Sequence, residues 1–194
     1  MKKKERVYRE ILYQALENEE RKLTQKNISN KCEVAIGTVN YALEPLEDMN
    51  AIEKRQRSFL AIDPKKILLY WASHRKIKKD IAYSTYFNGS VREIEQQLPN
   101  CLLTSYSAYK FRFGEPPAGY SEVWVYGKEQ EIKNRFRQKK GNENLFVLES
   151  DKHLEKFNEA PLSQLYVDLW NMDTWYASEY IKKLDEKLKK IIEY

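Results

Sequence analysis

The sequence predicts an α+β protein with a small helical N-terminal unit and a larger C-terminal unit of alternating strands and helices. Three observations favour this class. Apolar residues recur at helical spacing over the first 48 residues, a charged hairpin pattern follows them, and short apolar runs then alternate with amphipathic stretches. Of the 194 residues, 42% are hydrophobic and 13% aromatic, which is enough to build a core. We divide the chain into residues 1–63, a basic linker helix at 64–87 and a mixed α/β unit at 88–194.

The first unit begins with an amphipathic helix over residues 4–19, and Thr24 is placed to cap a second helix. In the second helix, Ile28 and Cys32 are four residues apart, so both should face the core. After a short turn, a third helix ends near Asn50, a residue that tolerates the left-handed conformation found beyond helix ends.

The third helix has an apolar and a polar side. We expect its buried row to contain Ile36, Val39, Leu43 and Leu46. The outward side then carries Gly37, Thr38, Asn40, Tyr41 and Glu44. Pro45 lies inside this helix, where the lost hydrogen bond and the ring clash cost ~3 kcal/mol, so we expect a kink or an early end there.

Residues 51–62 have the pattern of two strands around the polar tip 54–58. Three helices followed by a charged hairpin describe a winged helix-turn-helix, whose third helix enters the major groove of DNA. The segment 36–52 also resembles prokaryotic winged-helix regulators, in which Gly-Thr-Val opens the recognition helix and Leu-x-x-Leu-Glu closes it. We therefore predict binding of double-stranded DNA through Gly37, Thr38, Asn40, Tyr41, Lys54, Arg55 and Arg57.

The linker carries most of the net charge of +5, because residues 64–87 hold six basic residues and one acidic residue. Asp63 and Pro64 are typical of a helix start. A polyanion such as duplex DNA would meet this segment first. Lys76, Lys78 and Lys79 are therefore further candidate phosphate contacts, although the same run could be a solvated helix face.

In the second unit, Ser90 and Asp173 are expected as helix caps and Gly141 as a helix end. The expected strands cover residues 101–106, 121–127 and 144–150. The expected helices cover residues 90–98, 128–141, 160–171 and 173–194, and residues 107–114 are a helix or an amphipathic stretch.

Four segments carry a second resemblance: LLTSYSAYKF, SEVWVYG, NLFVLES and APLSQLYVDLWN, followed by a last amphipathic helix. Their order and spacing resemble the C-terminal domain of AbiEi-like abortive-infection type IV antitoxins, in which a winged helix precedes such a domain. The resemblance covers nearly the whole chain. It implies a DNA-binding transcriptional regulator whose C-terminal domain also neutralises a partner toxin of nucleotidyltransferase type.

The same segments echo the nucleotidyltransferase fold itself, so a degenerate form of that fold, or an enzyme that uses the winged helix as a clamp, stays open. Its chemistry needs a Gly-Ser turn and two carboxylates that hold Mg²⁺. Here Thr104 and Ser105 form the turn without glycine, and the following strand offers Glu122 alone. Asp168 is expected on a helix surface or beside a lysine. We therefore predict no enzyme, no catalytic residue, no metal and no cofactor. A pure protein-interaction module is a further alternative, against which the hairpin arginines argue.

Neither cysteine has a partner at metal-ligand spacing, so Cys32 and Cys101 are interpreted as small apolar residues in a reducing compartment. No apolar run approaches the ~18–20 residues of a membrane span, and the N-terminus lacks an apolar signal core. We expect a cytoplasmic protein.

A single winged helix contacts few base pairs, so we expect a homodimer, or a monomer that pairs on DNA, on two half-sites. The expected contact is the C-terminal region, with the aromatic residues Trp170, Trp175, Tyr176 and Tyr180 and with Ile181, Leu184, Leu188, Ile191 and Ile192 on one apolar side of the last helix. Part of this apolar side should pack in the core of its own chain. Base stacking by the aromatic rings is a further alternative.

Overall fold

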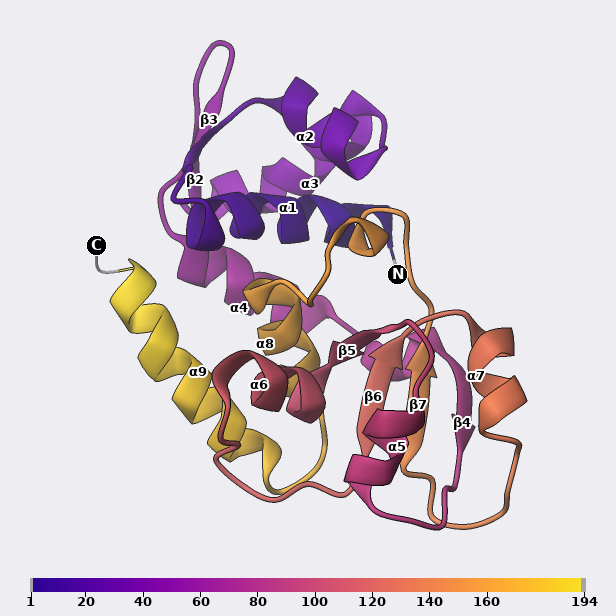
Figure 1. Cartoon of the computed structure of the whole chain (residues 1–194). Coiled ribbons are helices and arrows are strands. Elements are labelled where there is room, and N and C mark those ends of the chain that lie inside the picture. Colours follow the sequence, from indigo (N-terminus) through magenta and orange to yellow (C-terminus); the bar gives the residue numbers. More distant parts are fainter. Residues whose placement is uncertain (1, 193–194) are drawn as a thin grey trace.

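The computed structural model describes residues 2–192, which form an α+β protein with two small sheets among helices (Figure 1). No helix in this part of the chain has both the length and the apolar character needed to cross a membrane. The first half contains α1 (Lys3–Glu17), β1 (Lys22–Leu23), α2 (Gln25–Cys32), α3 (Ile36–Asp48), β2 (Ile52–Lys54), β3 (Phe59–Ala61) and α4 (Pro64–His74). The second half contains η1 (Ile77–Asp80), β4 (Ile81–Thr85), α5 (Val91–Gln97), β5 (Leu102–Thr104), α6 (Ser105–Phe113), β6 (Val123–Tyr126), α7 (Glu129–Arg135), β7 (Leu145–Leu148), η2 (Leu154–Lys156), α8 (Leu162–Trp170) and α9 (Ala177–Ile192).

Local signals set the boundaries of the first helices as expected. The Thr24 hydroxyl accepts the amide hydrogen of Asn27 at 3.1 Å and caps α2, which ends at Glu33 in the left-handed conformation. Asn50 adopts the same conformation, with φ of 55°, just beyond α3. Strands β2 and β3 form the predicted hairpin. The structure adds β1, which pairs with β3 and was not predicted, so the order in this sheet is β1-β3-β2.

Two expectations for α3 concern Pro45 and Ile36. The early end, one of the two alternatives expected at Pro45, does not occur, because α3 continues to Asp48. The ring at Pro45 costs one hydrogen bond, while the buried side chains of Val39, Leu43 and Leu46 hold the helix on the core. Ile36 is 52% exposed instead of buried. It is the first residue of α3, and Ala42 takes the fourth buried position of the helix instead.

The segment after the hairpin differs from the predicted linker helix. Asp63 caps α4 as expected, but the helix ends at His74. Residues 77–80 then form a 3₁₀ turn, and residues 81–85 form β4, an edge strand of the second sheet. The basic residues of this run therefore lie on several short elements and not on one helical face.

The second sheet has the order β4-β7-β6-β5, in which β6 and β7 are parallel and the two outer pairs are antiparallel. A capping box between Ser90 and Glu93 starts α5, as predicted. Two boundaries were wrong. Helix α7 ends at Arg135 and not at Gly141, and α9 begins at Ala177 and not at Asp173, whose carboxylate instead pairs with Lys78.

One apolar core runs through both halves of the chain. Helix α1 contacts α2, α3 and α4 in the first half and α8 and α9 in the second, and Figure 1 shows it lying between the upper and lower parts of the molecule. Buried side chains of this core include Val7, Ile11, Leu43, Trp71, Leu165 and Leu184. A smaller cluster fills the space between the second sheet, α5 and α7. The helical half is therefore packed on the α/β half through a shared core.

Candidate nucleic-acid interface

The start of α3 is fixed by a tight connection to α2. The Ser29 hydroxyl donates to the Val34 carbonyl at 2.6 Å, and the Val34 amide donates back to the Ser29 carbonyl at 3.1 Å. This arrangement leaves Gly37, Asn40 and Tyr41 exposed, and Thr38 is half-buried. A Cβ atom added at Gly37 would meet no atom within 4 Å, so this face of the helix is open.

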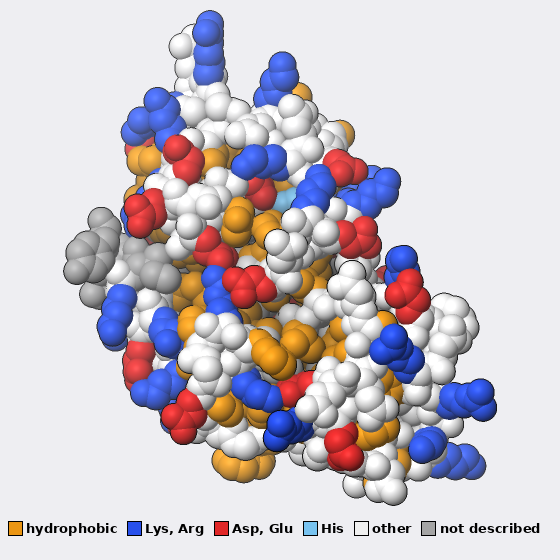
Figure 2. All heavy atoms as spheres, in the orientation of Figure 1, with side chains coloured by type: hydrophobic (Ala, Val, Ile, Leu, Met, Phe, Trp, Pro, Cys, Tyr) orange, Lys and Arg blue, Asp and Glu red, His pale blue; other side chains and the backbone are white. Residues whose placement is uncertain are grey.

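The hairpin beside α3 carries three of the predicted cations. The Arg55 amide donates to the Ser58 carbonyl at 2.8 Å and closes the tip. Lys54 pairs with Glu47 of α3 at 2.5 Å, and Arg55 pairs with Glu53 at 3.0 Å. Arg57 is exposed. Figure 2 shows a basic side chain at the end of the hairpin, which projects from the molecule at the top of the view.

The other predicted cations lie elsewhere. Lys76, Lys78 and Lys79 are exposed but follow the end of α4, whereas the hairpin joins its beginning. The 11 residues of α4 separate the two groups by about 16 Å of helix. Lys78 also pairs with Asp173 at 2.6 Å. The structure thus brings together the α3 and hairpin residues but not these three lysines.

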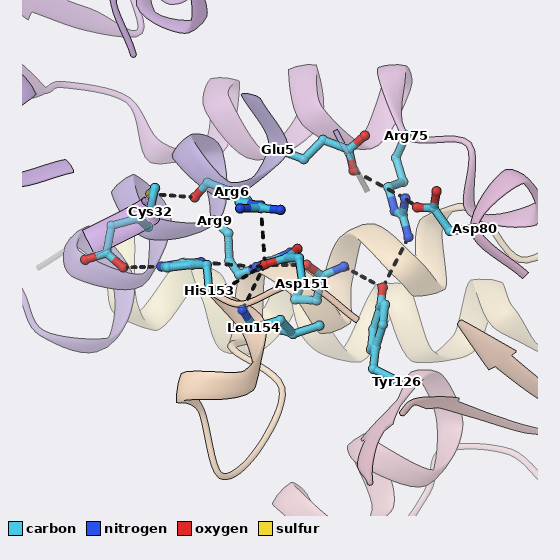
Figure 3. Close-up of polar contacts among 12 residues, drawn as sticks. Glu5, Arg6, Arg9, Cys32, Arg75, Asp80, Tyr126, Asp151, His153 and Leu154 are labelled. Carbon is cyan, nitrogen blue, oxygen red and sulfur yellow. Dashed lines mark hydrogen bonds and ion pairs between the residues drawn. The ribbon is translucent and has the colours of Figure 1, made fainter. Parts of the chain in front are cut away.

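A buried network of charged and polar side chains joins the two halves of the chain (Figure 3). The guanidinium of Arg9 in α1 donates to both carboxylate oxygens of Asp151, at 3.0 and 2.9 Å, and to the amide oxygen of Gln164 in α8 at 2.8 Å. Arg9 also lies 3.1 Å from Nδ1 of His153. Arginine only donates, so Nδ1 accepts, and the Nε2 hydrogen of His153 is left to bind Glu10 at 2.8 Å.

A second arginine forms the other end of this network. Arg75, which follows α4, is buried and pairs with Glu5 at 3.3 Å, with Asp168 at 3.4 Å and with Asp80. It also donates to the hydroxyl of Tyr126 at 3.2 Å. Arg75 belongs to the basic run in the sequence, yet it is buried and its charge is paired with carboxylates inside the protein.

Asp168, predicted on a helix surface or beside a lysine, lies elsewhere in the structure. It is fully buried in α8 and accepts hydrogen bonds from Thr104 at 2.8 Å and Tyr126 at 2.7 Å, in addition to its contact with Arg75. Gln164, one helical turn earlier, donates to it at 3.0 Å. Sequence patterns missed it because α8 is buried on nearly all sides and no charge of opposite sign lies nearby in the chain.

Burial and neighbouring charges shift several pKa values in this network. Burial raises the pKa of Glu5, and Arg75 opposes that rise. Burial raises the pKa of Tyr126 well above its usual value, and Asp168 adds to the rise. Burial also disfavours the charged form of Asp151, but hydrogen bonds and the charge of Arg9 outweigh it and lower the pKa to about 2.

A cleft of about 830 Å³ opens at the carboxyl ends of the parallel strands β6 and β7. Cys101, Tyr126 and Phe157 contribute to its lining, and none of the predicted DNA-contacting residues does. Across the described residues, no group of three or more histidine, cysteine, aspartate or glutamate side chains is arranged to hold a metal ion.

Comparison of the chain with family models, with curated proteins and with solved structures gave no match.

Replacing Arg75 by methionine is expected to lower the free energy of unfolding by about 3–5 kcal/mol, because the buried carboxylates of Glu5 and Asp168 would lose their cationic partner. Lys78→Met is the matched control, because the ion pair of Lys78 with Asp173 is exposed to solvent. Its removal should leave the unfolding midpoint unchanged. Urea denaturation followed by circular dichroism measures both. Equal midpoints for the two variants would contradict the structural role of Arg75.

His153 should make stability depend on pH. Burial lowers its pKa below the ordinary 6.5 of the unfolded chain, and Arg9 adds to this effect. The unfolded state therefore binds a proton before the folded state does, so stability is complete above about pH 6.5 and falls as the pH drops below it. Urea unfolding between pH 8 and 5.5 should show this loss for the parent and a smaller loss for His153→Gln. Parallel curves for the two proteins would contradict the assignment.

Proposed function

We propose that the protein is a sequence-specific double-stranded DNA-binding transcriptional regulator, in which α1 to α3 and the β2–β3 hairpin act as a winged helix-turn-helix. The observation that carries this proposal is the open N-terminal face of α3 beside a projecting cationic hairpin. A recognition helix enters the major groove with its N-terminal residues foremost, and a flanking hairpin contacts the backbone.

The polar and small residues on the open face support this function. Asn40 can bind adenine through two hydrogen bonds, and Thr38 can bind a base or a phosphate. No atom of the protein lies within 4 Å of the position that a Cβ at Gly37 would take. Because glycine has no side chain, the backbone at this position can approach a ligand closely. Tyr41 is 64% exposed on the same side, next in line along the helix.

The distribution of surface charge supports one orientation of a bound duplex. Lys26 at the start of α2 and Lys22 in β1 are exposed, as are Arg55 and Arg57 on the hairpin. These cations would attract backbone phosphates. The exposed acids of the second half of α3, Glu44, Glu47 and Asp48, would repel phosphates. We therefore expect only the first two turns of α3 to approach the bases, and we assign no DNA contact to Lys76, Lys78 and Lys79.

The hairpin arginines should set the salt dependence of binding. Each phosphate neutralised adds about 0.9 to the slope of log K against log salt, so the double variant Arg55→Ala/Arg57→Ala should bind all duplexes more weakly with a slope shallower by up to about 1.8. The probe is a duplex enriched by the parent from a randomised pool, with its scrambled version beside it. Fluorescence anisotropy at several salt concentrations gives the slopes.

Lys139→Ala/Lys140→Ala is the matched control, because it removes the same charge from an exposed loop of the second half. Its slope should equal that of the parent. Failure of the parent to enrich any duplex would overturn the proposed function, and equal slopes for the hairpin variant and the parent would remove the hairpin from the interface.

We further propose that two copies occupy one palindromic site. Four residues of the predicted contact between protomers are not available for it, because they are buried in their own chain: Tyr176, Tyr180, Leu184 and Leu188. Trp175 is 80% exposed, and it leaves an aromatic ring for a second copy. Ile191 and Ile192 were also expected at this contact, and their side chains lie outside the described residues.

Mass photometry of the protein on a palindromic duplex should count two protomers at saturation. Trp175→Ser should reduce the cooperativity of that binding, whereas Phe111→Ser, which removes a ring that is 63% exposed on α6, should not. One protomer per duplex at saturation on every palindromic site would refute the dimer.

A further inference from the structure

An isoleucine is exposed at the start of α3. Ile36 is the first residue of the helix and is 52% exposed, although the periodicity of the sequence predicts its burial. Single exposed apolar residues are common on protein surfaces and carry no meaning alone. Here, however, the residue lies on the helix that we propose enters DNA, one turn before the exposed amide of Asn40.

Ile36 and Asn40 belong to one row of side chains on α3, and an ion pair relates this row to the hairpin. Ile36, Asn40 and Glu47 lie on one flank of α3, because they are separated by close to one and three helical turns. The carboxylate of Glu47 is 2.5 Å from the ammonium of Lys54 in β2. The row therefore meets the hairpin at its Glu47 end, and Ile36 and Asn40 lie on the same flank nearer the start of the helix. A DNA groove that lies along this flank would hold the side chains of Ile36 and Asn40.

The chemistry of the two side chains selects one kind of base pair. The major-groove edge of thymine carries a methyl group, which makes apolar contacts, and the edge of adenine presents the N6 donor and the N7 acceptor that match a carboxamide. The two residues are about 6 Å apart along the helix axis, a little under two base steps of about 3.4 Å.

On the basis of the proposed DNA-binding function, we infer that the Ile36–Asn40 row determines sequence specificity by recognising a short A·T-containing element. Ile36 contacts the methyl group of a thymine, and Asn40 binds N6 and N7 of an adenine one or two base pairs away. Exposure of Ile36 is then the condition for recognition, since a buried Ile36 could not reach a base.

Removal of a single methyl group from the DNA tests the first contact. In the duplex enriched by the parent, each thymine is replaced in turn by deoxyuridine, which changes only that methyl group. At one position per half-site the parent should lose affinity about fourfold, the equivalent of ~0.8 kcal/mol for one methyl-sized group. Ile36→Ala should bind more weakly overall and show no further loss at that position. Ile62→Ala, an isoleucine that is 46% exposed after β3, is the matched control and should retain the parent's response.

The second contact is tested in the same way with 7-deazaadenine, which lacks the N7 acceptor. The parent should lose binding at one adenine within two base pairs of the sensitive thymine, and Asn40→Ala should be insensitive there. A parent that enriches no duplex would overturn the proposed function. A parent that binds its selected duplex but ignores every thymine replacement, or an Ile36→Ala protein with the parent's full thymine response, would overturn this inference and leave the proposed function standing.

Discussion

The buried guanidinium of Arg9 is the interaction on which the rest of the structure depends. It binds Asp151 through both carboxylate oxygens and Gln164 through a third hydrogen bond, and it therefore connects α1 to two separate segments of the second half. An ion moved from water into a protein interior costs several kcal/mol unless it is paired with good geometry. If α1 moved away from the second half, Arg9 would lose Asp151 and Gln164 as partners. The buried ion pair therefore holds α1 against the segments that carry these two residues.

This constraint also explains why residue types that are typical of active sites serve the architecture. His153 and Asp168 are buried and saturated with hydrogen bonds, and Tyr126 links Gln164, Asp168 and Arg75. The arginines Arg9, Arg75 and Arg57 differ in their exposure to solvent. Arg9 and Arg75 are buried and form ion pairs inside the molecule, whereas Arg57 is exposed to solvent. The ion pairs of the hairpin, Lys54 with Glu47 and Arg55 with Glu53, lie at the surface and contribute little to stability.

Elements with complete local signals could be predicted from the sequence. Thr24, Ser90 and Asp63 cap their helices as expected, and Asn50 takes the left-handed conformation, because each of these features depends on a few neighbouring residues. Strands β1 and β4 were missed since an edge strand of two residues, or one beside a basic run, has too little periodicity. The open face of α3 was also predictable, but the exposure of Ile36 was not. Helical spacing shows which side of a helix is apolar, but it does not show how far along the helix the core extends.

The sequence by itself determined the α+β class, the order of the helices and hairpin, and the outward position of Gly37, Asn40 and Tyr41, since periodicity and capping act over short distances. Only the tertiary structure decided which charges are available to a ligand. Arg9 meets Asp151 across 142 residues, and Arg75 meets Asp168 across 93. No local pattern encodes such pairs, because they form only when the shared core brings distant segments together and the cost of an unpaired buried charge selects the partner.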